Sequence, residues 1–81
     1  MDSEERRKYS RARTLKTARI IFNLRRSVID CTVRNMSSRG ACVDVVGAVR
    51  IPERFDLEVD HASHPCRVIW RKEDRLGVSF G

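Results

Sequence analysis

The sequence predicts an all-β domain, a six-stranded antiparallel β-barrel that follows a flexible basic N-terminal arm. Apolar and polar residues alternate with a period of two through six short segments, which is typical of half-buried strands. Polar residues and glycines typical of turns separate these segments. A closed barrel is favoured because closure removes the exposed edges that an open sheet of such strands would keep.

The alternation divides the chain into an arm of residues 1–16 and a barrel of residues 17–81. Turn-forming residues lie at 24–27, 35–40, 47–53 and 72–75, between the expected strands. The residues expected to face the barrel interior are Ala18, Ile20, Phe22, Leu24, Ile29, Cys31, Val33, Ala41, Val43, Val45, Phe55, Leu57, Val59, Cys66, Val68, Trp70, Leu76, Val78 and Phe80.

Length and composition limit the class of protein. Eighty-one residues with 41% hydrophobic content suffice for one domain with a single core. No apolar run approaches the roughly 20 residues that cross a bilayer, and the polar N-terminus lacks the apolar stretch of a secretory signal. We therefore expect a cytoplasmic protein without a membrane partner.

The sequence shows no arrangement typical of a metal centre or an enzyme. Cys31, Cys42 and Cys66 are odd in number and lack C-x-x-C spacing, which argues against a disulfide framework or a closed zinc site. His61 and His64 lie near Cys66, but their spacing matches no common zinc signature. No nucleophile–base arrangement or phosphate-binding P-loop is present, so we expect neither catalysis nor a cofactor.

Positive charge is concentrated in the first half of the chain. Of the net charge of +6, residues 1–40 contribute +7 (eleven Lys/Arg, four Asp/Glu) and residues 41–81 contribute −1 (six and seven). This asymmetry is consistent with an anionic partner, although a solvated basic tail would have the same composition.

Two short motifs carry groups that recognise nucleotides. The first, Arg6-Arg7-Lys8-Tyr9-Ser10-Arg11, offers guanidinium groups that grip phosphate oxygens or the O6/N7 edge of guanine. The second, Asn35-Met36-Ser37-Ser38-Arg39-Gly40, offers the amide of Asn35 and the hydroxyl of Ser37 to a base edge. Gly40 would permit a positive φ angle in this turn. Taken alone, each motif is also explained by an ordinary basic segment or a self-stabilising turn.

In order and spacing the two motifs resemble those of the PilZ domain family, receptor modules for the bacterial second messenger cyclic di-GMP. The family combines R-x-x-x-R with a later [D/N]-x-S-x-x-G, and here twenty-three residues separate Arg7-x-x-x-Arg11 from Asn35-x-Ser37-x-x-Gly40. The segment from Cys66-Arg67-Val68-Ile69-Trp70-Arg71 to Leu76-Gly77-Val78-Ser79-Phe80 is similar to the family's closing hairpin.

The resemblance implies that the arm closes over a nucleotide on the outer surface of the barrel. Arg7 and Arg11 would bind phosphates and guanine edges, Asn35 and Ser37 would hydrogen-bond a guanine, and Gly40 would shape the turn. A basic residue at the position of Arg6 accompanies two stacked ligand molecules in the family, so we state that stoichiometry as a hypothesis. Trp70 matches a position near the ligand in some relatives, whereas its place in the alternation equally fits a core aromatic.

Two alternatives to cyclic di-GMP binding stay open at this point. A small basic barrel could bind single-stranded nucleic acid, but only 6% of the residues are aromatic and most of them occupy positions expected to face inward. A PilZ-like module could also act through protein contacts alone, without nucleotide. A downstream protein partner is expected in either PilZ-like case, because a receptor domain must transmit its signal.

Overall fold

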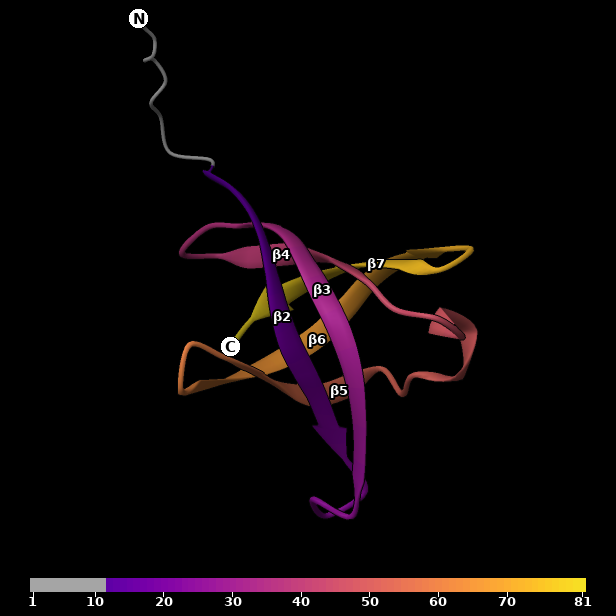
Figure 1. The fold of residues 1–81 in the computed structure, drawn as a ribbon. Coiled ribbons are helices and arrows are strands. Elements are labelled where there is room, and N and C mark those ends of the chain that lie inside the picture. Colours follow the sequence, from indigo (N-terminus) through magenta and orange to yellow (C-terminus); the bar gives the residue numbers. More distant parts are fainter. Residues whose placement is uncertain (1–11) are drawn as a thin grey trace, which may run out of the picture.

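The structure is a closed antiparallel β-barrel, which confirms the predicted fold class (Figure 1). The computed structural model describes the backbone of residues 12–81 and the side chains of residues 15–81. Around the barrel the strands follow the order β2-β3-β4-β7-β6-β5, and β5 pairs with β2 to close it. The strands are β2 (Ala12–Phe22), β3 (Ser27–Met36), β4 (Gly40–Asp44), β5 (Arg54–Val59), β6 (Ala62–Lys72) and β7 (Arg75–Phe80), and a short 3-10 helix, η1 (Ala48–Arg50), follows β4.

The first described strand begins earlier than the alternation indicated. Ala12 and Arg13 pair with Met36 and Asn35 of β3, so residues 12–16 belong to the β2–β3 ladder and not to the arm expected over residues 1–16. Leu15 adopts a positive φ of 48° where the register shifts between Arg13 and Lys16. This irregularity breaks the alternation of apolar and polar residues, so the alternation alone does not predict a strand over residues 12–16.

The barrel interior is filled by side chains from every strand. The side chains of Ile20, Val33, Val43, Leu57 and Leu76 are fully buried. Phe22, Ile29 and Phe80 are partly buried and pack against this core. The expected inward positions are therefore confirmed for most of the chain. Leu24 is an exception, because it lies in the turn after β2 and is 90% exposed.

Bulges in β3 and β6 interrupt the alternation. In β3 the register shifts between Val33 and Asn35, and in β6 it shifts between Val68 and Trp70. Each shift inserts one extra residue, which turns the following side chain to the opposite face of the sheet. As a result Trp70 lies on the outer surface with 44% of its surface exposed, and its placement as a core aromatic is wrong.

The connection between β4 and β5 covers one end of the barrel. Gly47 has a φ of 77°, and Ala48, the first residue of η1, and Ile51, the residue after η1, are buried in the core. The guanidinium of Arg71 donates hydrogen bonds to the carbonyl oxygens of Ala48 and Ile51. Within residues 12–81 no helix has the length and hydropathy required to cross a bilayer.

Candidate functional site

An open groove runs across the outer surface of β3, β4, β7 and β6. Strand register places four of its residues in one row of cross-strand neighbours, because Asn35 pairs with Cys42, Cys42 with Gly77, and Gly77 with Trp70. Adjacent strands lie about 4.8 Å apart, so the row spans roughly 14 Å from Asn35 to Trp70. The groove has a volume of about 620 Å³, which is within the range of small-molecule sites.

The two bulges determine which side chains reach this groove. Val33 is fully buried, and two positions further along an undisturbed strand Asn35 would also point inward. The extra residue, Arg34, instead brings Asn35 opposite Cys42 on the outer face. The bulge in β6 does the same for Trp70 at the other end of the row. The polar and the aromatic ends of the groove therefore both depend on an irregularity in a strand.

The turn between β3 and β4 borders the groove at the end where Asn35 lies. The backbone N–H of Ser37 donates to the carbonyl oxygen of Gly40 over 2.9 Å, and the Arg39 N–H donates to Ser37 Oγ over 3.2 Å. The Ser37 hydroxyl thus shapes its own turn while its proton stays available for a ligand. The carbonyl of Arg39 accepts a hydrogen bond from the N–H of Phe80, which fixes the turn against β7.

Glycines keep the groove open for steric reasons. Gly40 does not have the positive φ expected from the sequence. A Cβ at Gly40 would instead overlap with the carbonyl oxygen of Val78, because β4 and β7 approach closely at this point. A Cβ at Gly77 would overlap with the indole of Trp70. The indole consequently lies against the backbone of β7 and forms one wall of the groove.

A charged cluster borders the groove on the same face of the sheet. Asp44 is the next outward position on β4 after Cys42, and its carboxylate accepts hydrogen bonds from Arg34 Nη1 over 3.0 Å and Arg75 Nε over 2.8 Å. Burial opposes ionisation of Asp44, but the hydrogen bonds from Arg75 and Arg34 outweigh it and lower the pKa of the carboxyl. The cluster therefore holds two guanidinium groups beside the groove.

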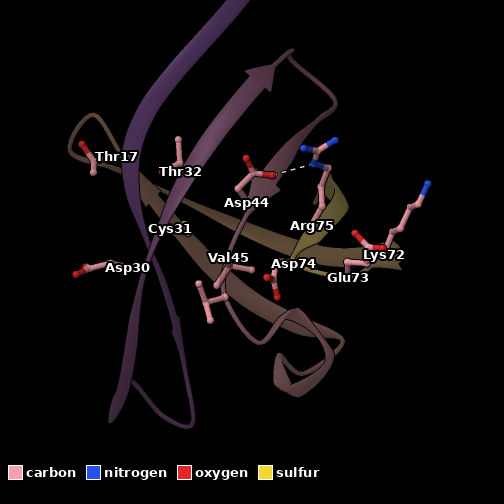
Figure 2. A pocket seen from close by; sticks show the side chains of 11 residues that line it. Thr17, Asp30, Cys31, Thr32, Asp44, Val45, Lys72, Glu73, Asp74 and Arg75 are labelled. Carbon is pink, nitrogen blue, oxygen red and sulfur yellow. Dashed lines mark hydrogen bonds and ion pairs between the residues drawn. The ribbon is translucent and has the colours of Figure 1, made fainter.

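Figure 2 shows the neighbouring pocket, whose lining residues include Asp44 and Arg75. Its volume is about 650 Å³, and the turn between β6 and β7 supplies Glu73 and Asp74 to its rim. Asp74 binds the loop after β4, because its Oδ1 accepts a hydrogen bond from the N–H of Gly47 over 3.1 Å. Asn35, Ser37, Gly40 and Trp70, the predicted binding residues that the structure describes, do not line this pocket, so we do not assign the site to it.

The three cysteines differ in access to solvent. Cys31 and Cys66 are buried among core residues, whereas Cys42 is half-buried and lines the groove. Burial, with a contribution from the charge of Asp30, raises the pKa of the Cys31 thiol to about 12. Burial raises the pKa of the Cys66 thiol to about 11. All three are free thiols, and Cys42 is the one positioned to sense a ligand in the groove.

The structure brings together every predicted site residue that it describes. Asn35, Ser37, Gly40 and Trp70 line one groove, although Trp70 comes from a distant part of the chain. Arg6, Arg7 and Arg11 lie outside the described residues. Further lining residues were not predicted as site residues, although Arg39 lies within the second motif and Ile69, Gly77, Val78 and Ser79 lie within the closing hairpin that resembles the family. The missed lining residues are Arg39, Ala41, Cys42, Ile69, Gly77, Val78 and Ser79.

The chain is similar to a known protein family. The family model described as PilZ domain matches residues 5–81, almost the whole chain. A search of curated proteins finds no match to this chain. The chain belongs to the PilZ domain family, whose members are receptor domains for cyclic di-GMP.

Proposed function

We propose that this PilZ domain binds cyclic di-GMP in the groove between Asn35 and Trp70 and acts as a receptor or adaptor in bacterial second-messenger signalling. Asn35 and Ser37 hydrogen-bond a guanine edge, and Trp70 offers an aromatic surface to a base. Arg7 and Arg11 bind the phosphates and close the site. The domain acts by binding, without catalysis or a cofactor, in the cytoplasm.

The convergence of two separate parts of the sequence on one groove carries this proposal. Asn35 and Ser37 come from the end of β3 and the turn after it, and Trp70 comes from β6, but all three line the same groove. Ala12 begins β2 opposite Met36, the residue after Asn35.

The positive charge near the groove matches a dianionic ligand. Arg39 lines the groove, and Arg34 and Arg75 are hydrogen-bonded to Asp44, two positions along β4 from the groove residue Cys42. A guanine base in turn presents donors and acceptors that the Asn35 amide and the Ser37 hydroxyl complement. A site that combines phosphate-binding cations, an amide and an aromatic wall suits a guanine nucleotide better than a purely apolar or purely acidic ligand.

Calorimetric titration of arginine variants tests the proposal. Arg7→Ala and Arg11→Ala should each weaken cyclic di-GMP binding at least about tenfold, because charge-assisted hydrogen bonds contribute roughly 1.5–3 kcal/mol each. Ser37→Ala should weaken it less, since a neutral hydrogen bond contributes about 0.5–1.5 kcal/mol. Arg50→Ala is the control, because Arg50 is exposed on η1 away from the groove. Unchanged affinity in both arginine variants would contradict the assignment.

A second titration separates nucleotide recognition from general binding of nucleic acid. Cyclic di-GMP and a short single-stranded oligonucleotide are compared at two salt concentrations. A receptor for the dinucleotide should prefer it at both concentrations, whereas a nucleic-acid-binding barrel should bind the oligonucleotide with an affinity that falls steeply with salt.

The same calorimetry measures the stoichiometry. We propose that two stacked cyclic di-GMP molecules bind per domain and that Arg6 contacts the second. Arg6→Ala should then reduce the stoichiometry from two towards one while the first molecule stays bound. A wild-type stoichiometry of one would reject the stacked pair and leave the receptor function standing.

A further inference from the structure

A third open pocket is lined by residues of β2, β5 and β6 and of the turn after β2, on the side of the barrel where β5 closes against β2. It has a volume of about 570 Å³. We call it the basic pocket, because Arg25, Arg54 and Arg67 line it, whereas Asp56 is the only acidic side chain among its described lining residues. The remaining lining residues are Ile21, Phe22, Asn23, Leu24, Phe55, Pro65, Cys66, Ser79 and Gly81.

Strand register brings two of these arginines side by side. Arg54 of β5 pairs directly with Arg67 of β6, and both are exposed. Like charges at directly opposed positions repel each other and destabilise a sheet. Arg67 lies 3.4 Å from Glu53 through Nε, in an ion pair whose two side chains are more than 60% exposed. Within residues 12–81, no ion pair joins Arg54 or Arg25 to a carboxylate.

The turn after β2 adds an exposed apolar side chain to the rim of the basic pocket. Asn23, Leu24 and Arg25 have φ values of 56°, 55° and 68°, three consecutive residues in the left-handed region. This conformation is disfavoured for most residues other than glycine and asparagine. It also leaves Leu24 90% exposed, while Ile21 beneath the turn is only 5% exposed. Figure 1 shows this hairpin projecting from the body of the barrel.

We propose that the basic pocket, with Leu24 at its rim, is a docking site for an acidic segment of a partner protein. Carboxylates of the partner would neutralise Arg25, Arg54 and Arg67, and an apolar side chain between them would cover Leu24. Such binding relieves the repulsion of the Arg54–Arg67 pair and removes an exposed leucine from water. The inference goes beyond the proposed function, because it uses neither the groove nor the nucleotide.

The shape and chemistry of the pocket favour a peptide over other polyanions. The paired arginines line a concave surface, which a flexible chain can enter but a flat bilayer cannot follow. Single-stranded nucleic acid needs exposed rings for stacking, whereas Phe55 is buried and Phe22 is half-buried.

Fluorescence anisotropy with a labelled synthetic peptide of repeated Glu-Glu-Leu units tests the proposal. The whole chain should bind it at low salt and more weakly as salt rises, because exposed charges are screened. The double variant Arg25→Glu/Arg54→Glu should weaken binding at least about tenfold, and Leu24→Ser about threefold. The double variant Arg25→Gln/Arg54→Gln, which removes charge without reversing it, should give an intermediate loss.

Residues on η1 provide matched controls. Val49 is 78% exposed and Arg50 is exposed, and neither lines the basic pocket. Val49→Ser and Arg50→Glu should therefore leave peptide affinity within about twofold of wild type. Circular dichroism and urea unfolding verify that each variant is folded.

Four results would overturn the proposal. The first is no binding of the acidic peptide by the wild-type chain. The second is equal binding of a peptide with Gln in place of Glu, and the third is wild-type affinity in Arg25→Glu/Arg54→Glu. The fourth is tighter binding to phosphatidylglycerol vesicles than to the peptide, lost in the same variant, which would assign the surface to a bilayer.

Discussion

At the scale of single residues, Gly77 controls the position of the only tryptophan in the chain. A Cβ at this position would overlap with the Trp70 indole, which is the movable end of a side chain. Gly77→Ala should therefore displace the indole from the groove wall and leave the barrel folded. We expect a weaker affinity for cyclic di-GMP and the loss of the fluorescence change that base stacking on Trp70 would cause. Fluorescence titration, with circular dichroism for the fold, measures both effects.

Gly40→Ala is the informative contrast to Gly77→Ala. A Cβ at Gly40 would overlap with the backbone carbonyl of Val78, which cannot move aside without separating β4 from β7. Gly40→Ala should therefore lower the midpoint of urea unfolding much more than Gly77→Ala does. If both variants lose stability equally, Gly77 has a structural role and does not specifically position Trp70.

Cys42 offers a direct probe of the groove. It is half-buried on the groove floor, whereas burial raises the pKa of the Cys31 and Cys66 thiols to about 12 and about 11 and removes them from solvent. A thiol-alkylating reagent should therefore modify Cys42 first, because the thiolate is the reactive form. Saturating cyclic di-GMP should slow this modification several-fold, as followed by mass spectrometry. Alkylation of Cys42 at the same rate with and without ligand would place the nucleotide elsewhere.

At the scale of strands, the alternation of apolar residues was sufficient to predict the fold class but not the faces of the site residues. Ile20, Val43 and Leu57 lie inside as their positions in the alternation predicted. Asn35 and Trp70 lie outside only because bulges shift the register before them. A bulge depends on how two strands are paired, and a period read along one strand does not contain that information.

Only part of the candidate site was predicted from the sequence, because some of its residues owe their role to a neighbour on another strand. The turn from Asn35 to Gly40 was recognised because its residues are consecutive in the sequence. Gly77 was not recognised, because its role depends on a cross-strand neighbour, Trp70. The positive φ expected at Gly40 was wrong, because the need for glycine arises from the close approach of β7.

The cluster that joins β3, β4 and β7 predicts an acid-dependent stability. The hydrogen bonds from Arg75 and Arg34 hold the pKa of Asp44 below its usual value, so its contribution to stability is present above about pH 4, near the pKa of an unfolded Asp. The contribution is lost as the pH falls through the lower folded-state pKa. Asp44→Asn should therefore destabilise the domain at neutral pH, and the difference from wild type should shrink in acid.

Urea unfolding of wild type and Asp44→Asn at about pH 7 and about pH 3 measures this difference. Asp60→Asn is a suitable control, because Asp60 pairs with Lys16 in a contact whose two side chains are largely exposed and which should contribute little. A difference between wild type and Asp44→Asn that does not change with pH would show that the carboxylate charge is not the source of the stability.

At the scale of the whole molecule, the strand pair that closes the barrel is not one of the strand pairs that carry the nucleotide groove. The barrel closes where β2 meets β5, through the pairs Arg19–Glu58, Ile20–Leu57 and Ile21–Asp56. The groove lies over β3, β4, β7 and β6. Ile20 and Leu57 are fully buried at the closure, and Val43 is fully buried on β4, beneath the groove. Stability and binding should therefore be separable by choosing the strand that is altered.

Leu57→Ala tests this separation. Truncation of a buried leucine costs about 2–5 kcal/mol, a large part of the roughly 5–15 kcal/mol that stabilises a domain. The urea midpoint should fall strongly, while the molecules that remain folded should bind cyclic di-GMP with wild-type affinity. Val43→Ala removes fewer atoms and should cost less stability, yet it should weaken binding, because its cavity lies under the strand that carries Cys42. Equal losses of affinity in the two variants would show that the barrel responds as one unit and that the groove is not independent of the closure.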